Sequence, residues 1–103
     1  MAKAVHNEAD LEPRTSRGMA WIGKTLEALA TELPIHVECW DWQVDSATGD
    51  DEQYCLTIVG KRHKRVAKVF SKQEIDRCLH DKILQQEVRL RLTKILTFLG
   101  PSH

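Results

Sequence analysis

The sequence lacks an excess of charge of either sign. Its 103 residues include 15 Lys and Arg and 15 Asp and Glu, so the formal net charge at pH 7 is zero. Most dedicated nucleic-acid binders carry a positive charge over the whole domain, and a global footprint of that kind is excluded here. Any electrostatic recognition must therefore depend on a local cluster of charges.

Long apolar runs are also missing. The apolar stretches are only a few residues long, whereas a membrane-spanning helix needs about 20 consecutive apolar residues. The first residues contain acids and no apolar segment of the length that a secretory signal requires. We therefore expect a cytosolic (cytoplasmic) protein without a targeting segment and with no membrane contact.

Cysteine is scarce and odd in number. The chain has three cysteines, Cys39, Cys55 and Cys78, at wide spacings. This pattern is typical of free thiols in a reducing compartment rather than of a disulfide framework. We expect the three thiols to fill the core.

The motifs of catalysis are absent. The sequence has five glycines, but no glycine-rich phosphate loop, no nucleophile elbow and no carboxylate pair on a rigid element. The chain is also small for an enzyme that must enclose a substrate pocket of several hundred Å³. We therefore expect no enzyme activity and no cofactor, although a Cys–His dyad stays open because such partners meet only in space.

Metal ligation has weak candidates. His36 and Cys39 would point to opposite faces of a strand, and no Cys-x-x-Cys pair exists to fix a tetrahedral zinc site. Buried thiols and surface imidazoles are the simpler interpretation, so we expect no metal and keep a zinc or thiol site as an alternative. The candidate ligands of such a site are His36, Cys39, Cys55, His63, Cys78 and His80.

Helical periodicity follows a polar start. Residues 1–14 have no periodic pattern, and we expect a flexible N-terminal arm ahead of a single domain at 15–100. From about Thr15 the apolar residues have helical spacing, and Pro34 stops the pattern because proline disfavours the helical conformation of the residue before it. The apolar positions are Met19, Ile22, Leu26, Leu29, Ala30 and Leu33.

A second helical region begins at Ser71. The spacing of Ser71 and Glu74 matches a capping box, in which each side chain accepts a hydrogen bond from the other residue's amide. An unbroken helix over 72–99 would be about 42 Å long, so we expect a break near His80-Asp81, with Asp81 as a new cap.

Three segments between these helices predict strands. Residues 35–44, 53–59 and 65–70 are rich in β-branched and aromatic residues. Their connections are short, which favours an antiparallel meander. The fold prediction is therefore α+β in the order α-β-β-β-α, with the helices packed on one face of a three-stranded sheet. Double-stranded RNA-binding domains share this order, but the acidic first turn and the Ser71-Lys-Gln-Glu helix start do not match their motifs.

The strand pattern places large apolar groups on both faces of this sheet. If Trp42 pairs near Cys55, the uncovered face gathers an apolar patch around Lys68, and such patches mark contact surfaces. The predicted interface consists of Trp40, Trp42, Val59, Val66 and Phe70. A register shifted by one residue would instead place both tryptophans beneath the helices with Tyr54, Leu56 and Ile58.

A basic cluster surrounds the second hairpin. It could contact phosphates, or it could be a solvated hairpin tip that resists aggregation. Its members are Lys61, Arg62, His63, Lys64, Arg65, Lys68 and Lys72. The first turn is acidic, so the two turns have opposite charge.

These patterns indicate a function only in outline. The favoured hypothesis is a small non-catalytic binding or regulatory module that self-associates as a homodimer and contacts another protein. It would use the sheet face or the last helix, where Ile83 and Leu90 lie off the main apolar stripe and indicate burial on more than one side. The alternative is RNA binding through the basic hairpin, Lys61 to Lys72.

Overall fold

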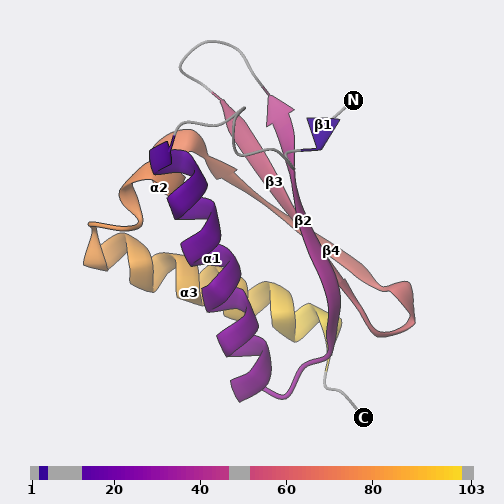
Figure 1. The fold of residues 1–103 in the computed structure, drawn as a ribbon. Coiled ribbons are helices and arrows are strands. Elements are labelled where there is room, and N and C mark those ends of the chain that lie inside the picture. The colour runs from indigo at the N-terminus through magenta and orange to yellow at the C-terminus, as the bar shows by residue number, and fades with distance from the viewer. Residues whose placement is uncertain (1–2, 5–12, 47–51, 101–103) are drawn as a thin grey trace.

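The computed structural model has two layers, a sheet and a layer of helices (Figure 1). It describes residues 3–4, 13–46 and 52–100. The elements are β1 (Lys3–Ala4), α1 (Pro13–Glu32), β2 (Val37–Ser46), β3 (Gln53–Gly60), β4 (Arg65–Ser71), α2 (Lys72–Arg77) and α3 (Lys82–Leu99), with a tight turn at Lys61–His63. The predicted α+β fold is thereby confirmed.

The sheet is antiparallel in the order β1-β2-β3-β4. Strands β2 to β4 form the predicted meander, and the helices cover one of its faces. The short β1 was not predicted; it pairs with Gln43 and Val44 of β2. Most of the predicted N-terminal arm, together with the acidic turn at 47–51, lies outside the described residues.

Prolines mark the start of helix α1 and the chain just after its end. Pro13 occupies its first position, where proline is favoured because no helical partner exists for an amide hydrogen there. The helix ends at Glu32, ahead of Pro34, as predicted. Two glycines on its buried face allow close approach: a Cβ at Gly18 would collide with the Ile75 carbonyl oxygen, and one at Gly23 would collide with the Trp40 ring.

The pairing of β2 with β3 places the tryptophans under the helices. Trp42 lies opposite Leu56 and Trp40 opposite Ile58. Opposed residues of an antiparallel pair share a face, so this is the shifted register that the sequence left open. Four of the five predicted interface residues, Trp40, Trp42, Val66 and Phe70, lie on the covered face. The predicted patch is therefore wrong in its placement, and of its members only Val59 lies on the uncovered face.

A β-bulge sets this register. At the start of β2, Val37 lies opposite Gly60. If that pairing continued unbroken, Trp42 would lie opposite Cys55. The register shifts between Val37 and Cys39, which adds one residue to β2 and moves every later side chain to the other face relative to β3.

The core lies between the sheet and the helices. Trp42 packs against Phe70 with ring centroids 5.7 Å apart at an angle of 57°. The Trp42 indole Nε1 is buried without a hydrogen-bond partner among the described residues, a cost that apolar packing must offset. The side chains buried most completely include Phe70, Ile22, Leu26, Leu56, Ile58, Ile75, Leu92 and Leu96. No helix of the described residues is long and apolar enough to cross a bilayer.

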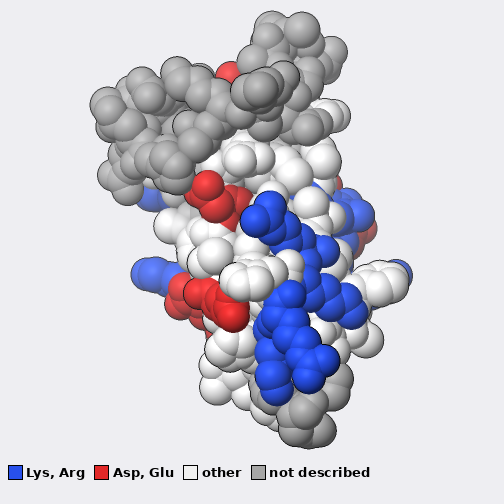
Figure 2. Space-filling view, turned by 90° about the vertical axis from the view of Figure 1, so that its right-hand side faces the viewer, with Lys and Arg blue, Asp and Glu red and all other residues white. Residues whose placement is uncertain are grey.

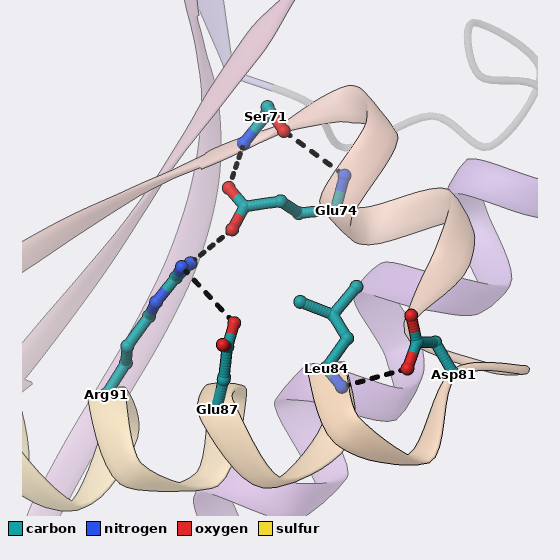
Figure 3. A network of polar contacts seen from close by, with 6 residues as sticks. All are labelled: Ser71, Glu74, Asp81, Leu84, Glu87 and Arg91. Atoms are coloured by element: carbon teal, nitrogen blue, oxygen red, sulfur yellow. Dashed lines mark hydrogen bonds and ion pairs between the residues drawn. The ribbon is translucent and has the colours of Figure 1, made fainter.

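The helical region after β4 breaks where predicted. Ser71 Oγ accepts from the Glu74 amide at 3.1 Å, and the Glu74 carboxylate accepts from the Ser71 amide at 3.1 Å, which confirms the capping box. Asp81 caps α3 by accepting from the Ile83 and Leu84 amides. Figure 3 shows both caps.

One ion pair ties α3 to the first cap. Arg91 donates to Glu74 at 2.5 Å, and its other terminal nitrogen lies 4.0 Å from Glu87 (Figure 3). Burial raises the pKa of Glu74, but the Ser71 hydrogen bonds and the Arg91 guanidinium outweigh burial, so the pKa is held below its ordinary value of 4.5. The negative charge of Glu74 therefore stabilises the fold.

Removing this charge gives a pH-dependent loss of stability. We expect Glu74→Gln to keep the cap geometry but to lower the free energy of unfolding at pH 7 by about 1–2 kcal/mol. A carboxylate whose folded pKa is lowered stabilises above its unfolded pKa, and the effect disappears as pH falls through the folded pKa. The wild-type and variant urea curves should therefore converge below about pH 4; a constant gap between them would contradict the assignment.

Candidate functional site

The tip of the β3–β4 hairpin is strongly basic and fully accessible. The five consecutive residues Lys61, Arg62, His63, Lys64 and Arg65 are all exposed. We call these five the basic tip. Figure 2, which views the molecule from the side of this hairpin, shows a band of Lys and Arg side chains with carboxylates beside it. In the structure, the local basic surface predicted from the sequence is thus concentrated at this turn.

The backbone of the basic tip is strained. Arg62 and His63 have φ values of 62° and 60°, as in the two central residues of a type I′ hairpin turn, and the Lys64 amide donates to the Lys61 carbonyl at 3.3 Å. That turn favours Asn-Gly, because a positive φ costs conformational free energy in most other residues. Bulky cationic and imidazole side chains therefore occupy positions at which they destabilise the hairpin.

Two members of the predicted cluster lie away from the tip. Lys68 lies opposite Leu56, on the covered face of β4. Lys72 begins α2, beyond the other end of β4, and its Nζ lies 3.1 Å from Asp76. Because β4 separates them by roughly 20 Å at about 3.3 Å per residue, Lys72 and the tip cannot act as one patch.

The Glu38 carboxylate lies close to the basic tip. His63 Nδ1 lies 3.9 Å from one Glu38 oxygen, and His36 Nε2 lies 4.0 Å from the other. Glu38 is the residue inserted by the β-bulge. All three side chains are exposed, so these contacts are weak.

The uncovered sheet face, which we call the open face, has no large aromatic groups among its described residues. It includes Cys39, Asp41, Gln43, Cys55, Thr57, Val59, Arg65, Ala67 and Val69. The prediction that all three cysteines fill the core is wrong for two of them: Cys39 is exposed and Cys55 half-buried. Both alternate with the buried residues of their strands, so they face away from the helices.

The remaining thiol, that of Cys78, is buried and has a raised pKa. Cys78 is buried and donates to the Ile75 carbonyl at 3.1 Å. Burial, followed by the nearby Asp76 charge, raises the pKa of the Cys78 thiol to about 11. Within the described part of the chain, no three His, Cys, Asp or Glu side chains come together as a metal site. Neither His36–Cys39 nor Cys78–His80 is therefore supported as a ligand set.

No protein-family model, curated protein or solved structure matches this chain.

The outer face of α3 carries the three most exposed large apolar side chains of the described residues. Ile83, Leu90 and Phe98 are 75%, 63% and 69% exposed, although they are among the largest apolar side chains of the helix. The sequence indicated the first two, since both lie off the main apolar stripe. Phe98, which is close in sequence to the buried Leu96 and Leu99, was not singled out from the sequence.

The strain at the basic tip predicts a stabilising double substitution. Arg62→Asn with His63→Gly supplies residues suited to positive φ and should raise the free energy of unfolding by about 1–2 kcal/mol. Lys64→Gly is the control, because Lys64 has an ordinary φ of −64° and glycine there should destabilise by about 0.5–1 kcal/mol. Urea denaturation measures both. Equal effects of the two changes would contradict the strained geometry.

Proposed function

We propose that this protein is a non-catalytic cytosolic binding module that self-associates through the outer face of α3. The observation that carries the proposal is the exposure of Ile83, Leu90 and Phe98 on one helix. Interfaces derive most of their binding energy from a few large side chains, and an exposed apolar group of this kind is a common sign of a contact surface.

The open face supports self-association less well. Its apolar members, such as Val59, Ala67 and Val69, are small. Large anchors are missing because the tryptophans and Phe70 face the helices. The free edge of β4 carries Arg65 at its start, a charge of the kind that discourages strand pairing between molecules.

The chemistry of the buried Cys78 thiol supports a non-catalytic role. A cysteine nucleophile needs a lowered pKa, whereas that of Cys78 is raised to about 11. A cytosolic location is supported by the exposed free thiol of Cys39, which persists most readily in a reducing compartment.

Charge at the centre of the α3 face should abolish association. We expect the wild-type mass from light scattering to rise above the monomer value of 11.8 kDa as concentration increases toward about 1 mM, because a weak dimer forms by mass action. Leu90→Glu should hold the mass at the monomer value at all concentrations. Arg89→Glu, an exposed change on the flank of the same helix, should leave association intact. A wild-type monomer throughout this range would disprove the proposal.

Nucleic-acid binding through the basic tip is a second candidate. It is favoured by the five exposed residues of the tip and by the retention of Arg62 and His63 at strained positions. Strain at a surface turn suggests a hypothesis of function, and cationic side chains on a protruding hairpin can contact phosphates. The zero net charge of the chain favours self-association as the first proposal.

Charge reversal at the tip tests the second candidate. If RNA binds there, Arg62→Glu with Lys64→Glu should remove binding of a fluorescent single-stranded or duplex RNA at low salt, measured by anisotropy. Arg17→Glu with Lys24→Glu reverses as many exposed charges on α1 and is the matched control. Wild-type binding should weaken steeply with salt, since phosphate contacts release counterions. Absence of wild-type binding, or equal losses in both variants, would eliminate the tip as a nucleic-acid site.

A further inference from the structure

The exposed residues of α3 follow a regular helical line. Residues 83, 87, 90, 94 and 97 are spaced four and three apart, the spacing that aligns side chains along one side of a helix. Phe98 lies beside the end of this line. We call the set the outer stripe: Ile83, Glu87, Leu90, Lys94, Thr97 and Phe98 are its members, and all are exposed. The stripe lies opposite the buried positions Val88, Leu92, Ile95, Leu96 and Leu99.

The order of charges along the outer stripe is self-complementary in one direction. We infer that α3 packs antiparallel against α3 of a second copy, about a two-fold axis at Leu90, with Glu87 beside the partner's Lys94. This inference rests on the proposed self-association and assigns its partner and geometry. A two-fold axis makes the same contact twice, so each Glu87 meets a Lys94.

The axial positions fit this arrangement. With Leu90 on the axis, Glu87 lies about one residue, or roughly 1.5 Å, from the level of the partner's Lys94. Ile83 lies level with the partner's Thr97 and next to the partner's Phe98. The interface between the two α3 helices, which we call the seam, therefore has apolar contacts at both ends and Leu90 at its centre. Opposite charges lie between the centre and each end.

A parallel arrangement does not fit. In register, it would place Glu87 against the partner's Glu87 and Lys94 against the partner's Lys94, and like charges at such positions oppose association. Glu87 remains accessible for an intermolecular pair, because its side chain is 56% exposed and its intramolecular contact with Arg91 is 4.0 Å long.

The seam is short. From Ile83 to Phe98 it spans about 22 Å at 1.5 Å per residue, and one helix from each copy buries an area at the low end of specific interfaces. We expect a weak dimer, with a dissociation constant on the order of 10–100 μM, so concentration controls the state of the protein.

Charge exchange tests the orientation. Glu87→Lys and Lys94→Glu should each weaken the dimer about tenfold in analytical ultracentrifugation, since each turns two attractions into two repulsions. The double variant Glu87→Lys with Lys94→Glu should recover wild-type affinity. A mixture of the two single variants should also associate, because every facing pair is then opposite in sign. Lys94→Glu remains informative if the loss of the Arg91 contact perturbs Glu87→Lys.

A cross-link separates this inference from the proposed function. In a Cys39→Ser, Cys55→Ser background, Ile83→Cys mixed with Thr97→Cys should form a disulfide-linked dimer under mild oxidation, and Ile83→Cys alone should not. Ile83→Cys cross-linking to itself, or single and double charge variants of equal affinity, would overturn the antiparallel pairing. If Leu90→Glu still dissolves the dimer in that case, self-association through α3 survives with another geometry.

Discussion

The bulge between Val37 and Cys39 constrains the rest of the structure, because it fixes how β2 pairs with β3. Side chains alternate along a strand, so one inserted residue exchanges the two faces of β2 relative to its partner. With the bulge, Trp40 and Trp42 share a face with Leu56 and Ile58 and supply bulk to the core. Without it, those indoles would face away from α1 and α3, and Gly23 of α1 would have no ring to pack against.

This register also determines where apolar surface remains. One sheet face receives the large side chains and the helices, and the other keeps small or polar ones such as Thr57 and Ala67. The excess apolar surface that the sequence suggested for the sheet is therefore found on α3, where Ile83 and Leu90 point away from the core. Helix α3 is held in this orientation at two places, by its Asp81 cap and by the pairing of Arg91 with Glu74.

Features encoded by neighbouring residues could be predicted from the sequence. The stop at Pro34, the Ser71–Glu74 box and the break at Asp81 each depend on contacts within one turn of chain. The strand positions were also recognised, with boundaries that shifted by one or two residues. The register could not be predicted, because a bulge has no sequence signature at Val37–Cys39, and the face of Cys39 follows from the register. The basic tip was found because its residues are contiguous, whereas Lys72 is close in sequence but lies beyond the far end of β4.

The two candidate surfaces respond differently to salt, and this follows from their composition. In the proposed dimer, the outer stripe of α3 would combine apolar contacts, which salt does not screen, with one kind of exposed ion pair, so added salt should change association only modestly. The basic tip has cations but no large apolar group among Lys61 to Arg65, so any affinity for a polyanion would depend almost entirely on counterion release and would fall steeply. The surfaces lie on separate elements, and substitutions in one should act independently of the other. A protein with zero net charge gains no general attraction to polyanions, so at physiological salt the proposed contact through the apolar face of α3 should be weakened less than the proposed contact through the basic tip.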